Sequence, residues 1–129
     1  MDLDELIAAA TAARARAYAP YSGFRMGAAV LTASDTVVTG ALVENVSLGL
    51  AMCAERVALF STVAADDRPV ALVVVSPRTD GATTFPCGAC IQVGLELGGP
   101  DMAVVAVTVD GEVEQARLGD LLPRGPRKT

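Results

Sequence analysis

The chain has 129 residues, a length that suits one domain with one hydrophobic core. Its formal net charge of −5 argues against sequence-independent binding to nucleic acid, which needs a basic face. Hydrophobic residues make up 52% of the chain, yet no apolar run approaches the roughly 18 residues that span a bilayer, so we expect no membrane segment. The apolar excess instead favours self-association, because obligate interfaces resemble a core.

The first helix is expected from Asp4 to Tyr18, where apolar residues recur with helical spacing and Pro20 then ends the segment. Two strands at 26–32 and 36–43 are expected to form a hairpin, followed by a helix at 53–64 and a buried strand at 70–75. A further helix at 87–97, a strand at 102–109 and a short helix near 118–122 complete the order. This order fits a mixed sheet with helices on both faces, in one domain over 1–129 whose last residues, 124–129, form a flexible tail.

All three cysteines lie in two short motifs, each at the expected start of a helix. Cys53 opens the sequence Cys-Ala-Glu-Arg, whereas Cys87 and Cys90 belong to Pro-Cys-Gly-Ala-Cys. Cysteines three residues apart share one helix face, and the N-terminus of a helix stabilises thiolates. Three thiolates can hold one Zn²⁺ in a tetrahedral site whose fourth position stays open to water. The sequence therefore predicts one zinc ion per subunit.

Two charged residues of the first motif indicate that the predicted zinc site is catalytic. Glu55 follows Cys53 by two residues, so its carboxylate can handle the proton of a water whose pKa the metal lowers. Arg56 is expected to offset the excess negative charge that three thiolates bring to a dication. We therefore interpret the motif as a catalytic zinc site.

Two other uses of the cysteines are less consistent with the sequence. A closed structural zinc site requires a fourth cysteine or a histidine, and the chain has neither. A redox pair formed by Cys87 and Cys90 would leave Cys53 and Glu55 without a role. The odd number of cysteines and an acidic N-terminus without a signal-peptide pattern also argue against export, so we expect a reduced, cytoplasmic protein.

The paired motifs resemble the signatures of the small homotetrameric zinc-dependent cytidine deaminases, which are related to blasticidin S deaminase. The resemblance covers most of the chain, with further matching segments at 20–24, 27–29, 43–45, 49–50 and 119–123. It implies a three-layer α/β/α fold with a five-stranded mixed sheet and active sites near subunit contacts. It also implies hydrolytic conversion of cytidine or deoxycytidine to the uridine product with release of ammonia.

The same resemblance implies roles for individual residues beside the three zinc-binding cysteines and the general acid/base, Glu55. Phe24 would stack on the pyrimidine, and Glu44, next to Asn45, would contact a sugar hydroxyl. The N–H of Ala54 would face the base carbonyl, and Arg56 would donate a hydrogen bond to a thiolate. The implied partners are a small-molecule substrate and further copies of this chain.

The chain departs from the family pattern at positions that do not bind zinc. Leu42 replaces an asparagine that helps to bind the sugar, Leu48 replaces a tyrosine that reaches the neighbouring subunit, and Ile91 replaces an arginine. Phe85 stands where serine is common, and the aromatic residue usual near the C-terminus is absent. A site that loses a hydrogen-bonding side chain discriminates less sharply, so these changes fall on sugar recognition, neighbour contacts and charge balance.

These departures leave three hypotheses. The favoured one is a cytidine or deoxycytidine deaminase with a relaxed sugar pocket, because Phe24, Glu44 and Asn45 remain. The second is a specialised deaminase of a modified cytosine nucleoside or another aminoheterocycle, as in blasticidin S deaminase. The third is a non-catalytic zinc-binding subunit of an assembly, against which the intact Glu55 argues. Editing of polynucleotides is disfavoured by the acidic charge.

Overall fold

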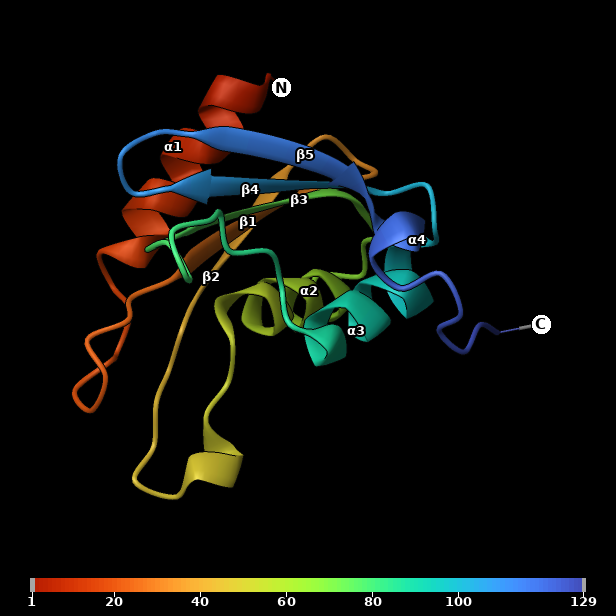
Figure 1. Ribbon diagram of the computed structural model, residues 1–129. Helices are drawn as coiled ribbons and strands as arrows, with labels where there is room; N and C mark the ends of the chain where they lie inside the picture. The colour runs from red at the N-terminus through yellow and green to blue at the C-terminus, as the bar shows by residue number, and fades with distance from the viewer. Residues whose placement is uncertain (1, 129) are drawn as a thin grey trace.

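Five strands form one mixed sheet in the computed structural model, which describes residues 2–128 (Figure 1). The neighbours β3 and β4 are parallel, and every other pair is antiparallel. In sheet order, the strands are β2 (Val37–Ala41), β1 (Gly27–Thr32), β3 (Pro69–Ser76), β4 (Ala103–Thr108) and β5 (Val113–Arg117).

Helices cover both faces of the sheet, which confirms the expected three-layer α/β/α arrangement (Figure 1). One face carries α1 (Leu3–Arg14), and the other carries α2 (Ala54–Ala64) and α3 (Gly88–Gly98). The short helices are η1 (Leu48–Leu50) and α4 (Leu118–Leu121). Between residues 2 and 128, none of the helices has the length and apolar character needed to cross a bilayer.

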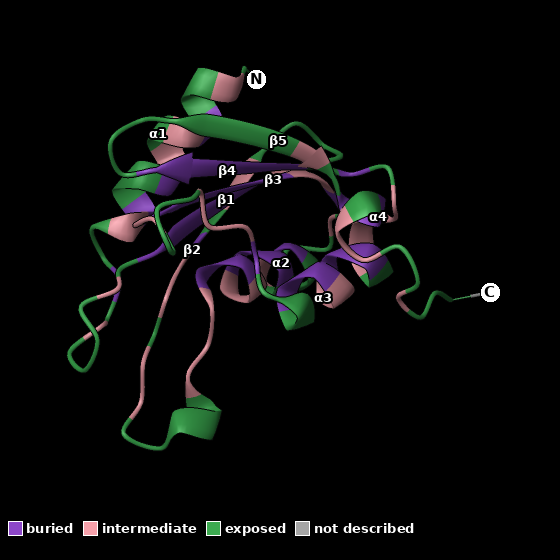
Figure 2. Cartoon of the chain, in the orientation of Figure 1, coloured by how far each residue is buried: buried purple, intermediate pink, exposed green. Residues whose placement is uncertain are grey.

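The central strands are buried on both sides, so the sheet separates two hydrophobic cores (Figure 2). In β3, Leu72 and Val74 face α2 and α3, whereas Val73 and Val75 face α1. All four side chains are at most 3% exposed. Full burial of such a side chain contributes about 1.5–3 kcal/mol, which explains why β3 reads as a continuous apolar run.

The first helix ends at Arg14, four residues earlier than the periodicity predicts, because the chain finds other backbone partners. The N–H of Tyr18 donates to the carbonyl of Leu42 at 2.8 Å, and the N–H of Glu44 donates to the carbonyl of Tyr18 at 2.8 Å. These bonds form a short parallel bridge between Tyr18 and Val43, beyond the end of β2. The bridge ties the residues before Phe24 to the segment that carries Glu44.

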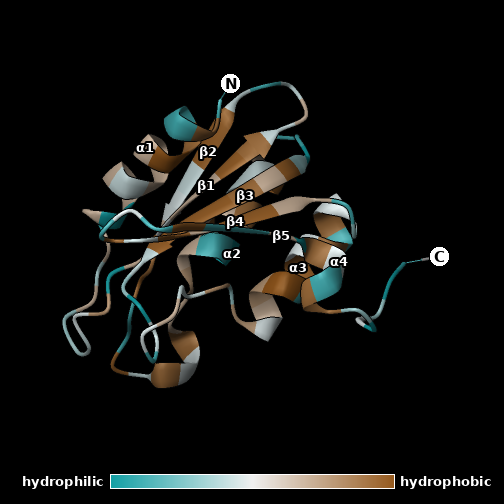
Figure 3. Ribbon diagram, turned by 45° about the horizontal axis from the view of Figure 1, so that its top comes forward, coloured by the Kyte–Doolittle hydropathy of each residue, from teal (hydrophilic) through white to brown (hydrophobic). Residues whose placement is uncertain are grey.

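Strand β5 was not predicted from the hydrophobic pattern. Its sequence, Val-Glu-Gln-Ala-Arg, is largely hydrophilic and lies at the edge of the sheet beside the apolar β4 (Figure 3). The strand forms because the turn at Asp110 and Gly111 returns the chain for antiparallel pairing with β4. An edge strand pairs its backbone on one side only, and the side chains of β5 are mostly exposed. Its sequence therefore lacks the apolar pattern by which buried strands are recognised.

The C-terminal residues also contact the body of the protein. The side-chain amide of Gln92, in α3, donates to the carbonyl of Pro126 at 2.9 Å. The expected flexibility of residues 124–129 stays a prediction, and residue 129 lies outside the described part of the chain.

Two glycines in the hairpin let a helix approach each face of the sheet. A Cβ at Gly27 would lie 2.2 Å from the carbonyl oxygen of Ala10, in α1. A Cβ at Gly40 would lie 2.5 Å from the carbonyl oxygen of Ala54, in α2. Both contacts involve backbone atoms, which cannot turn aside as the end of a side chain can. The close helix–strand packing therefore depends on the missing side chains.

We expect Gly27→Ala to lower the free energy of unfolding by about 1–3 kcal/mol or more, because the added methyl forces α1 away from β1. The control is Gly49→Ala, since a Cβ at Gly49 meets no atom within 4 Å. Urea unfolding followed by circular dichroism measures both variants. Equal midpoints for Gly27→Ala and Gly49→Ala would contradict the close approach.

Candidate metal centre

Two helix starts hold the cysteines. Cys53 is the N-cap residue of α2, and Cys87 is the N-cap residue of α3, both with extended backbone. Neither side chain caps its own helix through a hydrogen bond, so both thiols remain directed to other partners. Cys90 lies in the first turn of α3 and is buried. Because α2 packs against α3, the three thiols come together.

The sulfur atoms have the separations that one tetrahedral ion requires. All three Sγ atoms lie within 4.8 Å of one another. Cys53 and Cys87 are 4.0 Å apart, and Cys87 and Cys90 are 3.6 Å apart. Zn–S bonds of about 2.3 Å in a tetrahedron place sulfurs about 3.8 Å apart, so the thiols fit zinc with little movement. Across residues 2–128, no second such cluster of metal-binding side chains occurs.

Arg56 supplies positive charge beside the thiols. Its Nη2 atom donates to Cys53 Sγ at 3.6 Å. Hydrogen bonds from Cys90 and from Arg56 lower the pKa of Cys53, whereas the contact with Cys53 and burial raise the pKa of Cys90. One thiol of the pair therefore ionises first, and a bound dication would provide the charge that stabilises the others.

Glu55 is a buried acid whose carboxylate lacks a full set of partners. The residue is 1% exposed in the first turn of α2, and its Oε1 atom has no hydrogen-bond partner within the described structure. Burial, together with the charge of Cys53, raises the pKa of Glu55 to about 7. A buried, unpaired carboxylate oxygen costs free energy unless a ligand or water meets it. Glu55 is therefore suited to exchange a proton close to neutral pH.

Phe24 and Ala54, which are expected to contact the base, lie on the same side of the sheet as α2 and α3. Phe24, Leu42 and Phe85 are half-buried and pack against the core that contains Ala54. Ala54 is the first residue of α2, so its N–H has no acceptor within the helix. The roles of Phe24 and Ala54 toward a substrate remain predictions.

Glu44 and Asn45 form hydrogen bonds within the protein. The N–H groups of Tyr21 and Ser22 donate to Glu44 Oε1 at 2.9 and 3.3 Å, and the Ser22 hydroxyl donates to Oε2 at 2.5 Å. These bonds hold the pKa of Glu44 below its ordinary value, with the Ser22 hydroxyl as the main cause. Asn45 Oδ1 accepts from the N–H of Ser47 at 2.9 Å. In the sequence, residues 21–23 indicate only a turn, and no local pattern signals the bond between Ser22 and Glu44.

The departures from the family pattern occupy different environments. Ile91 is 3% exposed and belongs to the core beneath α3, so no charge stands there. The short helix η1 forms the tip of loop 43–52, which projects from the body of the protein (Figure 1), and its first residue, Leu48, is 83% exposed. Val46 and Leu50, in the same loop, are 79% and 69% exposed. The loop therefore presents an apolar surface to its surroundings.

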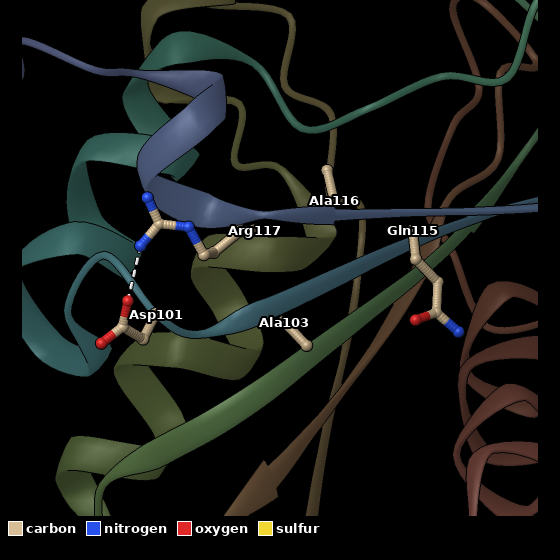
Figure 4. A pocket seen from close by; sticks show the side chains of 5 residues that line it. All are labelled: Asp101, Ala103, Gln115, Ala116 and Arg117. Atoms are coloured by element: carbon tan, nitrogen blue, oxygen red, sulfur yellow. Dashed lines mark hydrogen bonds and ion pairs between the residues drawn. The ribbon is translucent and has the colours of Figure 1, made fainter.

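A surface hollow on β4 and β5 has different chemistry. Its lining includes Asp101, which accepts a hydrogen bond from Arg117 at 2.5 Å, and Gln115 (Figure 4). It contains no cysteine and no buried acid. The cysteine cluster is therefore the stronger candidate for a reactive site.

Comparisons with known proteins identify the family. Residues 1–110 match the family model described as the cytidine and deoxycytidylate deaminase zinc-binding region. A cytidine deaminase of Halalkalibacterium halodurans is 42% identical over 95% of this chain and 92% of the relative. A cytidine deaminase of Mycobacterium tuberculosis is 46% identical over 95% of this chain and 88% of the relative.

Solved structures agree with the sequence relatives. The crystal structure of a cytidine deaminase from Burkholderia pseudomallei is similar with a TM-score of 0.91 and 50% identity, over 98% of this chain and 100% of the other. A cytidine deaminase from Mycobacterium tuberculosis gives a TM-score of 0.81 and 41% identity, over 97% of each chain. The cysteine cluster, the fold and these similarities agree. The chain therefore belongs to the family of cytidine and deoxycytidylate deaminases.

Proposed function

We propose that this protein is a zinc-dependent hydrolytic deaminase that converts cytidine and deoxycytidine to uridine and deoxyuridine. The observation that carries the proposal is the cluster of three thiols beside the buried Glu55 carboxylate, whose Oε1 lacks a partner in the described structure. A metal site with three protein ligands and an adjacent proton-handling acid is typical of hydrolytic deamination of nucleobases. Family membership supports the same reaction.

Cys53, Cys87 and Cys90 would hold the zinc ion, which when bound supplies Lewis-acid activation of water. Glu55 takes one proton from the attacking water and passes it to the ring nitrogen. It then takes the second proton from the hydroxyl newly bonded to C4 and passes it to the leaving amine. The water oxygen forms a bond to C4 of the pyrimidine, the bond from C4 to the amine breaks, and ammonia leaves.

The substrate contacts belong to the same proposal. Phe24 stacks on the base, and the N–H of Ala54 donates to the base carbonyl. Glu44 accepts a hydrogen bond from a sugar hydroxyl, for which its carboxylate retains acceptor capacity beyond the three bonds within the protein. Asn45 supports that contact through the turn that it caps. Leu42 offers only apolar contact to the sugar, so discrimination between ribose and deoxyribose is weak.

We also propose a cytoplasmic homotetramer. Loop 43–52 exposes four large apolar side chains, those of Val43, Val46, Leu48 and Leu50, more than an isolated loop would be expected to leave in water. Association with further copies would cover them. The cytoplasmic assignment is supported by the three cysteines, which are free thiols and need a reducing environment to remain metal ligands.

The test is deamination of cytidine, deoxycytidine and free cytosine by zinc-loaded protein, followed by the loss of ultraviolet absorbance. We expect fast turnover of both nucleosides. The matched variant is Glu55→Gln, which keeps the shape of the side chain and should lower kcat at least about 10²-fold while zinc remains bound. Near-normal turnover by Glu55→Gln would remove Glu55 from the mechanism.

The same assay distinguishes the other hypotheses. A protein that holds zinc but deaminates neither nucleoside would contradict the proposal. Turnover of a modified cytosine nucleoside or another aminoheterocycle would then assign a specialised deaminase. Zinc binding with no ammonia released from any amine would indicate a non-catalytic subunit.

Arg56→Gln should weaken zinc affinity about 10- to 100-fold, because the guanidinium that hydrogen-bonds Cys53 is lost and Ile91 supplies no second cation. Competition with a chromophoric chelator measures the affinity. The control, Arg16→Gln, removes the same charge from an exposed position outside the site. Equal affinities for both variants would show that Arg56 does not stabilise the thiolates.

Leu48→Asp should shift the tetramer to smaller species, because a charge at the tip of loop 43–52 cannot be buried against another copy without a partner. Light scattering coupled to size-exclusion chromatography gives the assembly size. Val109→Asp, at an apolar residue that is 55% exposed elsewhere, is the control. A monomeric wild-type protein, or an unchanged assembly for Leu48→Asp, would count against the proposed interface.

A further inference from the structure

We propose that Ser22 is a positioning residue that couples the base-stacking and sugar-facing parts of the nucleoside site. This inference rests on the proposed function, in which Phe24 meets the base and Glu44 meets the sugar. Ser22 lies between them in the structure. Its hydroxyl donates to Glu44 Oε2 at 2.5 Å and accepts from the N–H of Phe24 at 3.0 Å. One hydroxyl group thus joins the two substrate-contacting residues.

The bonds around Glu44 show why a small hydroxyl has this influence. A carboxylate has about four acceptor positions, and the turn at 21–22 occupies three of them. Glu44 is therefore oriented by the turn that leads to Phe24, and one acceptor position remains for a sugar hydroxyl. Glu44 comes from the segment after β2, so the contact joins parts of the chain that are 22 residues apart.

A second set of bonds fixes the other side of Phe24. Arg14 Nε donates to the carbonyl of Arg25 at 2.9 Å, and Arg25 Nη1 donates to the carbonyl of Ala15 at 3.1 Å. These bonds hold the residue after Phe24 against the end of α1. Within residues 2–128, Ser22 provides the side-chain connection from this anchored turn to Glu44. Removal of its hydroxyl takes away the acceptor of the Phe24 N–H and one of the three bonds to Glu44, so that side of Phe24 keeps only the backbone bonds from the turn to Glu44.

The expected consequence is a loss of substrate binding with little loss of chemistry. The three cysteines and Glu55 lie at the starts of α2 and α3, and in the described part of the chain Ser22 has no hydrogen bond to either helix. Ser22→Ala should therefore raise KM for cytidine about tenfold, the scale of one hydrogen bond to a charged group, and leave kcat within about twofold. Ser22→Thr keeps a hydroxyl and should restore most of the affinity.

The matched control is Ser34→Ala. Ser34, in the turn between β1 and β2, also donates a hydrogen bond from its hydroxyl to a carboxylate, that of Asp67. Ser34→Ala should lower stability slightly without any change in KM. All variants are compared as zinc-loaded full-length protein.

A double-mutant cycle tests the coupling itself. Because Glu44→Ala already removes the acceptor of the Ser22 hydroxyl, Ser22→Ala should raise KM less in that background than in the wild type. Additive effects, or an unchanged KM for Ser22→Ala in an active enzyme, would overturn the proposal. A kcat that falls as much as kcat/KM would also overturn it, because positioning of bound substrate would not be the cause.

Amide hydrogen exchange in the wild-type protein provides a readout independent of catalysis and of the variants' folding. The amides of Tyr21 and Phe24 should be protected, because each donates to the Ser22–Glu44 pair. Exchange at the unprotected rate would contradict the connection whatever the enzyme does. If these amides are protected but no nucleoside is deaminated, the proposed function fails and the structural connection stands.

Discussion

The contact between α2 and α3 is the constraint on which the metal centre depends. Each helix begins at a cysteine, and their packing against the same face of the sheet brings the two starts to one point. The first turns then deliver Cys90 to the cluster and the Glu55 carboxylate to its edge. A shift of either helix along the sheet would separate thiols that lie at most 4.8 Å apart. Gly40, which lets α2 approach β2 closely, belongs to the same constraint.

The clustering of the three cysteines could be predicted from sequence because the relevant signals are local. Spacing by three residues at a helix start fixes Cys87 and Cys90 on one face, and the three-layer fold follows from the order of apolar runs and turns. The edge strand β5 could not be found in this way, since backbone pairing rather than burial forms it. The early end of α1 likewise depends on Leu42, a partner far along the chain.

The residues proposed to contact the substrate show the same contrast between features with a local sequence signal and features that depend on distant partners. Motif resemblance selects Phe24 and Glu44, but their connection through Ser22 arises only when the hairpin returns the chain to the 20–24 turn. No periodicity or turn propensity reports a bond between residues that are 22 positions apart. The buried state of Glu55 was also beyond the sequence, because a charged residue in the first turn of a helix is ordinarily exposed.

A cysteine at an N-cap can help to bind a metal ion, but it does not stabilise its helix as a capping residue would. Serine, threonine, aspartate or asparagine at an N-cap satisfies a free N–H, which stabilises a helix by about 0.5–2 kcal/mol relative to alanine. Cys53 and Cys87 make no such bond, so α2 and α3 both begin without this stabilisation. Selection for thermal stability alone would therefore favour replacement of the very residues that assemble the site. A zinc ion held by these cysteines would tie the two helix starts together, so the stability that the missing caps withhold would come from ion binding instead.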